Sequence, residues 1–136
     1  MDEASNRRQK DKDWVSRPGR YVVAWGLPMA ALIAAVFLPP LARTVIGTAA
    51  LLWMGAACLA NAARCGRTHC YFTGPFFLIL AAGVALHGAK IFWLGPDGWI
   101  WLGITSVAGA VILWWLPEWM WGKFVKFSGK HGRNKP

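Results

Sequence analysis

The sequence lacks the residue patterns that most enzymes of hydrolysis and group transfer need. It has six acidic residues against fifteen Lys and Arg, and it contains no paired carboxylates, nucleophile triad, P-loop or dinucleotide-binding fingerprint. The two acids beyond the first twenty residues, Asp97 and Glu118, are each alone near the ends of apolar runs. We therefore expect a protein that is not an enzyme.

Charge is also scarce in the middle of the chain. Six of the fifteen Lys and Arg precede Tyr21 and five follow Leu116. The chain is 56% hydrophobic with a mean hydropathy of +0.35, which is too apolar for an ordinary soluble domain. A nucleic-acid-binding protein with the same net charge of +9 would spread that charge over a folded surface. The distribution instead indicates an integral membrane protein that binds no nucleic acid.

Four apolar runs predict the fold. Their lengths, 18 to 20 residues, match what a helix needs to cross a hydrocarbon core of about 30 Å. The predicted spans are residues 21–38, 44–63, 76–94 and 98–116. Short connections require antiparallel neighbours, and no run alternates with the period of two that a barrel strand would show. We expect an all-α integral membrane protein with four transmembrane helices in an antiparallel bundle.

The basic residues predict how this bundle is oriented. Residues 1–20 form a polar, solvated tail, and residues 117–136 form an interfacial segment followed by a basic tail. With four spans, both tails and the second connection share one face, which carries thirteen Lys and Arg against two on the other. The positive-inside rule places that face in the cytoplasm. We expect a multi-pass protein of the bacterial inner membrane with both termini in the cytoplasm. Its basic inner face would contact anionic lipid, and it could form a homo-oligomer.

The second connection, residues 64–75, holds the residues best suited to chemistry. Cys65, His69 and Cys70 lie within six positions, and Cys58 precedes Cys65 by two helical turns on the same face. Thiolate and imidazole groups are the ligands that soft and borderline metal ions prefer. We therefore predict a metal site formed by Cys65, Cys70 and His69, with Cys58 as a deeper ligand. A soft or transition metal ion (mercury, copper or zinc), bound or transported, is the one cofactor that this pattern indicates.

The same connection supports two other hypotheses. Arg64, Arg67 and a predicted helix N-terminus at Gly74 would suit an anion or a lipid phosphate, in a protein that serves as a non-catalytic scaffold. Thiol redox exchange between Cys65 and Cys70 is a third hypothesis, because neighbouring cations favour the reactive thiolate.

Three polar residues inside the predicted spans are further candidates. They are His87, Lys90 and Asn61. An ionisable residue inside a span is by default a functional hypothesis, and we expect His87 and Lys90 to lie one turn apart on the third helix. Asn61 lies near the inner end of the second span, where it could donate a hydrogen bond to the connection or across helices.

The segment Cys65-Gly-Arg-Thr-His-Cys-Tyr-Phe-Thr-Gly-Pro75 resembles a motif of small uncharacterised bacterial membrane proteins. The size of the chain, its span number and its cysteines near one membrane face also resemble the membrane transporters of mercury resistance. That resemblance implies transfer of a soft metal ion through cysteine pairs, with Cys65 and Cys70 as the matching positions. The chain departs from those transporters because it has no adjacent Cys-Cys pair and no cysteine in its first span.

Overall fold

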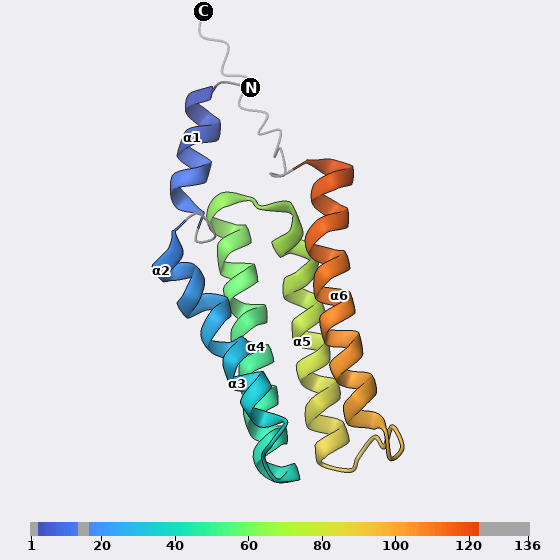
Figure 1. The fold of residues 1–136 in the computed structure, drawn as a ribbon. Helices are drawn as coiled ribbons and strands as arrows, with labels where there is room; N and C mark the ends of the chain where they lie inside the picture. The colour runs from blue at the N-terminus through green and yellow to red at the C-terminus, as the bar shows by residue number, and fades with distance from the viewer. Residues whose placement is uncertain (1–2, 14–16, 123–136) are drawn as a thin grey trace, which may run out of the picture.

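The computed structural model describes residues 3–13 and 17–122, apart from the side chains of Gln9 and Cys65, and every regular element in this part of the chain is helical (Figure 1). The predicted all-α class is therefore confirmed. The elements are α1 (Glu3–Lys12), α2 (Pro18–Tyr21), the π-helix η2 (Val22–Gly26), α3 (Leu27–Ala35), α4 (Pro40–Cys65), α5 (Thr68–Gly88) and α6 (Gly98–Trp121).

Three of the described helices, α4, α5 and α6, are long and apolar enough to cross a membrane. The first predicted span, residues 21–38, is not one α-helix, because the π-turn of η2 separates α2 from α3. Pro28 follows this turn at the start of α3. A proline ring clashes with the carbonyl four residues earlier, and a wider π-turn accommodates that clash. Residues 21–38 therefore form a broken helical segment, and a fourth span stays a prediction.

The connection between α4 and α5 is much shorter than predicted. Only Gly66 and Arg67 lie between the two helices. Gly66 adopts a left-handed φ of 71°, and its N–H donates to the carbonyl of Ala62 at 2.8 Å, which ends α4. The prediction of a twelve-residue polar hairpin was wrong, because α4 continues to Cys65 and α5 already begins at Thr68. The chain reverses direction within two residues, and α5 returns along α4 (Figure 1).

Two glycines let the backbones of α4 and α5 approach closely. A Cβ atom added to Gly74 would lie 2.7 Å from Cγ of Leu59, and one added to Gly55 would lie 2.8 Å from Cδ2 of Leu78. The Cβ position on Gly55 is also 3.1 Å from the carbonyl oxygen of Gly74. This glycine-to-glycine crossing is the close helix contact that membrane bundles build from small residues.

Three segments distant in sequence meet at the end of the molecule where α4 turns into α5 (Figure 1). Arg67 of the turn pairs with Asp13 and with Glu118 of α6, and Thr68 donates a hydrogen bond to Gly122 at 2.6 Å. Residues 3–12 of the predicted solvated tail are helical, as α1, and their described side chains are exposed, whereas Asp13 is fully buried.

The other predicted span limits also shift. The second, third and fourth predicted spans correspond to α4, residues 40–65, to α5, residues 68–88, and to α6, which continues to residue 121 instead of ending at 116. The predicted basic tail from residue 123 onward lies outside the described residues.

Candidate thiol and histidine site

A buried ion cluster forms the end wall of the site. The guanidinium of Arg67, of which 7% of the side chain is exposed, pairs with the fully buried carboxylate of Asp13 and, through Nε, with Oε1 of Glu118 at 2.9 Å. Burial alone would lower the pKa of Arg67, but the hydrogen bonds and charges of Asp13 and Glu118 outweigh that effect and raise it. Arg67 therefore stays cationic and gives a positive partner to the buried carboxylate of Asp13 and to the half-buried carboxylate of Glu118.

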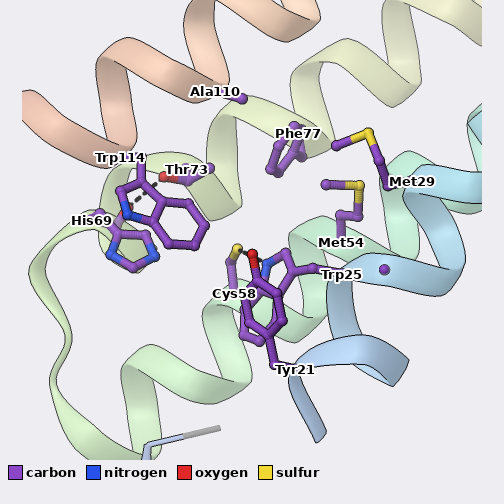
Figure 2. Close-up of a pocket in the computed structure, with 11 residues that line it drawn as sticks. Tyr21, Trp25, Met29, Met54, Cys58, His69, Thr73, Phe77, Ala110 and Trp114 are labelled. Atoms are coloured by element: carbon purple, nitrogen blue, oxygen red, sulfur yellow. Dashed lines mark hydrogen bonds between the residues drawn. The ribbon is translucent and has the colours of Figure 1, made fainter. Parts of the chain in front are cut away.

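His69 extends this cluster toward the interior. Its Nδ1 lies 2.6 Å from Oε1 of Glu118 and 3.3 Å from Nε of Arg67. Its other ring nitrogen, Nε2, lies 3.4 Å from Sγ of Cys70. The ring stacks on Trp114 with centroids 4.5 Å apart (Figure 2). A histidine whose other ring N–H is held by a carboxylate is the arrangement typical of metal-ligating histidines.

Two thiols from neighbouring helices meet beside His69. Cys58 of α4 and Cys70 of α5 are 1% and 0% exposed, and the two thiols lie close enough for each to influence the ionisation of the other. Each sulfur also accepts from a nitrogen donor: Nε1 of Trp25 lies 3.3 Å from Sγ of Cys58. Nδ2 of Asn61 lies 3.5 Å from Sγ of Cys70. N–H donors aimed at both sulfurs would stabilise negative charge there.

The helix crossing brings the two thiols together. Gly55 precedes Cys58 by three residues on α4, and Gly74 follows Cys70 by four residues on α5. Both offsets correspond to about one helical turn, so each thiol lies on the same helix face as its glycine. The thiols therefore lie about one turn from the point where the two backbones are closest.

A cavity of about 180 Å³ opens beside this site, with walls from every long element of the described bundle (Figure 2). Cys58, His69 and Thr73 line the part nearest the ion cluster. The remaining walls are Tyr21, Trp25, Gly26, Met29, Met54, Phe77, Ala110 and Trp114. The cavity is therefore apolar apart from a few side chains at one end.

The structure brings together some of the predicted metal ligands. Cys58, His69 and Cys70 are adjacent, whereas the side chain of Cys65 lies outside the described residues. Within the described part of the chain, no group of three or more His, Cys, Asp and Glu side chains is arranged to hold a metal ion. The described residues thus offer a two-thiol site with a neighbouring imidazole, and a role for Cys65 stays a prediction.

The predicted anion site is not assembled as expected. Gly74 is buried inside α5, whereas the helix begins at Thr68, so the prediction of a helix N-terminus at Gly74 was wrong. Arg67 already pairs with two carboxylates of the protein, those of Asp13 and Glu118. Arg64, in the last turn of α4, is exposed.

The polar residues predicted inside the spans separate into two regions. Asn61 is fully buried and donates to Asp13 at 2.9 Å as well as to Cys70. His87 is buried near the opposite end of α5, where Nδ1 accepts from the backbone N–H of Leu94 at 3.3 Å. Lys90 lies beyond the end of α5 with a left-handed φ of 58°, so the prediction of His87 and Lys90 one turn apart on a helix was wrong.

Sequence reasoning missed four residues of the site. They are Asp13, Trp25, Trp114 and Glu118, and the prediction that Glu118 is alone was wrong. The one signal available for Glu118 was its position at the end of an apolar run. A charged residue buried there needs a partner of opposite charge. Asp13 lies among other charged residues of a polar segment, so no local pattern distinguishes it.

No family model, no curated protein and no solved structure matches the chain. The site therefore has to be interpreted from its own geometry.

Proposed function

We propose that this chain is a small membrane protein that binds a soft metal ion between Cys58 and Cys70 and passes it on toward one membrane face. The observation that carries the proposal is the proximity of two buried thiols, each with its own N–H donor, beside Nε2 of His69, which contacts Sγ of Cys70. Two thiolates suffice for a soft d¹⁰ ion, because such ions prefer sulfur ligands. A site of this kind needs no third acidic or cysteine ligand.

The hydrogen bonds to sulfur favour a metal site over a purely structural pair. Ligating thiols must release their protons, which leaves negative charge in an apolar interior. The N–H groups of Trp25 and Asn61 point at the two sulfurs and compensate part of that charge. His69, held by Glu118, is an auxiliary ligand through Nε2.

Burial distinguishes this function from thiol redox exchange with a partner protein. Exchange requires a thiolate to attack a disulfide sulfur directly, and neither Cys58 nor Cys70 offers more than 1% of its surface. A single metal ion, by contrast, is small enough for the adjacent cavity of about 180 Å³.

The membrane setting completes the proposal. We infer that α2, η2 and α3 together cross the bilayer as a fourth segment beside α4, α5 and α6, in an antiparallel bundle of the bacterial inner membrane. The contacts of Arg67 with Asp13 and Glu118 support a shared face for the N-terminal segment, the α4–α5 turn and the end of α6. The excess of Lys and Arg on that face supports its placement in the cytoplasm.

The test is metal binding by the purified, reduced full chain in detergent. Hg(II) titration should give a thiolate-to-metal absorbance that saturates at one ion per chain. Cys58→Ser and Cys70→Ser should each abolish it, because a single thiolate cannot replace the pair. Circular dichroism of each variant checks that the helices remain folded.

Cys65→Ser is the matched control, and it separates this site from the hairpin site predicted from sequence. Binding that survives Cys65→Ser supports the Cys58–Cys70 pair. Binding that is lost in Cys65→Ser and kept in Cys58→Ser would overturn the proposal. If all three serine variants are silent and Arg64→Ala impairs the protein in cells, the lipid or scaffold hypothesis is favoured instead.

A further inference from the structure

Asp13 is a fully buried carboxylate in the segment that precedes the apolar runs of the chain. Its backbone N–H donates to the carbonyl of Lys10 at 3.2 Å, which joins it to the last turn of α1. Its side chain reaches the end of the bundle, where Oδ2 pairs with Nη1 of Arg67 and Oδ1 accepts from Nδ2 of Asn61 at 2.9 Å. Asp13 therefore contacts the residue that donates to Cys70.

Asn61 connects this carboxylate to the thiol site. Its Nδ2 lies 2.9 Å from Oδ1 of Asp13 and 3.5 Å from Sγ of Cys70. An asparagine amide has two hydrogens on its nitrogen and none on its oxygen, so this one nitrogen can donate to both partners. All three side chains are fully buried, so the two hydrogen bonds form without competition from water.

The charge on Asp13 fixes which end of the Asn61 amide faces the sulfur. A carboxylate accepts hydrogen bonds and has no hydrogen to donate. The Asn61 atom beside Asp13 must therefore be the nitrogen, and the same nitrogen is the atom beside Cys70. A reversed amide would set its oxygen against the carboxylate and would place a lone pair beside the sulfur, where it disfavours a thiolate.

From this geometry we propose that Asp13 is a positioning residue for the metal site, because it holds Asn61 as the hydrogen-bond donor to the Cys70 thiolate. The inference rests on the two-thiol function proposed above and deepens it. The N-terminal segment, distant in sequence from both thiols, thereby contributes to metal affinity. Residues that orient the groups around metal-bound atoms typically change affinity by roughly ten- to hundredfold when they are replaced.

The variant Asp13→Asn distinguishes this role from that of a structural ion pair. It keeps the shape of the side chain but has one oxygen and one NH₂ group in place of two oxygens. Arg67 only donates, so it takes the oxygen, and the new amide turns its hydrogens toward Asn61. Asn61 must then present its own oxygen, and that oxygen replaces the donor beside Cys70. A purely structural role would lower stability and leave the affinity of the folded protein unchanged.

The experiment is Hg(II) binding by the reduced full chain in detergent, in competition with dithiothreitol and read by the thiolate-to-metal absorbance. Cys65→Ser serves as the parent chain, because it leaves Cys58 and Cys70 as the two thiols. Asp13→Asn should weaken the apparent affinity roughly ten- to hundredfold. Asp11→Asn removes the same charge from the exposed surface of α1 and should match the parent. Circular dichroism checks that each variant is folded.

A second set of variants tests whether Asp13 acts through Asn61. Asn61→Leu has the same branched shape and no donor, so it should weaken binding by a similar factor. In the Asn61→Leu chain, Asp13→Asn should cause no further loss, because no amide is left to reverse. Asp13→Glu keeps an acceptor-only carboxylate and should bind Hg(II) more tightly than Asp13→Asn does.

The outcomes separate the two proposals. If the parent binds Hg(II) through its two thiols, and either folded Asp13→Asn or folded Asn61→Leu binds with the parent's affinity, the positioning role is overturned and the thiol site stands. A further loss from Asp13→Asn in the Asn61→Leu chain would also overturn it, because Asp13 would then act by another route. If the parent shows no cysteine-dependent absorbance, the two-thiol function itself fails and the positioning role fails with it.

Discussion

The two buried histidines of α5 have very different surroundings. His69 and His87 are 0% and 6% exposed and lie about 27 Å apart along the helix. His69 contacts a carboxylate, a thiol and the face of Trp114. His87 accepts a backbone hydrogen bond and packs in a T-shaped arrangement with Trp99, with ring centroids 5.1 Å apart. Burial of an imidazole therefore says little about its role, whereas the charged and sulfur-bearing partners of His69 distinguish a candidate site.

Two arginines, one at each end of the bundle, also differ in whether their partners are charged. Arg67 neutralises two carboxylates in a buried cluster. Arg43, near the end that holds His87, donates to the neutral carbonyls of Val36 and Leu38 and lies over the ring of Trp99. The end of the molecule that holds Arg67 is thus stabilised by paired charges. The end that holds Arg43 is stabilised by hydrogen bonds to the backbone and by aromatic packing.

The largest expected effect comes from removing the charge of Arg67. Arg67→Met leaves Asp13 buried without its cation and should lower the free energy of unfolding by about 3–5 kcal/mol. Arg43→Met removes hydrogen bonds to neutral carbonyls and should cost roughly 1 kcal/mol. Thermal unfolding in detergent, followed by circular dichroism, measures both. Equal losses would show that the two ends are stabilised in the same way.

Replacing each histidine with glutamine tests the comparison of His69 with His87. His69→Gln removes a hydrogen bond to the carboxylate of Glu118 and should cost about 1.5–3 kcal/mol. His87→Gln removes an acceptor for one backbone N–H and should cost about 0.5–1.5 kcal/mol. Chemical denaturation of the two variants measures how much unfolding free energy each one loses. A larger loss for His87→Gln would contradict the ranking of the two ends.

Glycines of α5 provide a matched pair for the helix crossing. Gly74→Ala places a Cβ atom 2.7 Å from Leu59 and should cost about 1–3 kcal/mol, because α4 and α5 must move apart. Gly83→Ala meets only Cδ2 of Leu102 at 3.7 Å and should stabilise the helix by about 0.5–1 kcal/mol.

Metal binding provides a second measurement for this pair. Separation of α4 from α5 in Gly74→Ala should weaken Hg(II) binding by Cys58 and Cys70, whereas Gly83→Ala should leave it intact. Unchanged binding in a destabilised Gly74→Ala would show that the crossing does not position the thiols.

The smallest expected effect concerns the link between α5 and the end of α6. Thr68→Val removes a hydroxyl that donates to the carbonyl of Gly122 at 2.6 Å and should cost about 0.5–1.5 kcal/mol. Ser106→Ala is the control, because its hydroxyl bonds within α6 to Leu102 and adds little to helix stability. Unfolding temperatures that fall equally in both variants would argue against a tertiary role for Thr68.

Much of the fold could be predicted because apolar length is a local property. The runs behind α4, α5 and α6 are long, uncharged and easily recognised. Their limits were less accurate at the turn, where Thr73, Gly74 and Pro75 resemble a helix start although the helix begins five residues before Thr73. Packing against α4 keeps Gly74 helical, and local propensity contains no information about that contact.

Part of the site could be predicted for the same reason. Cys70 and His69 are adjacent in sequence, and Cys58 lies at a helical spacing from the turn. Asp13 and Glu118, more than 100 residues apart in the chain, meet only because Arg67 lies between them in the folded bundle. Hydrogen bonds across such distances have no signature in the spacing of residues.

The sequence alone determined the helical class, the apolar lengths that suit a membrane, the uneven distribution of basic residues and the presence of thiols near one end. Hydrophobicity and charge are properties of each residue, so they can be summed along the chain. Tertiary structure alone decided that Cys58 and Cys70 meet, that His69 is held by Glu118, and that Met29 and Met54 line the same cavity. Those contacts depend on the close crossing at Gly55 and Gly74 and on the register between helices, which packing sets after the helices have formed.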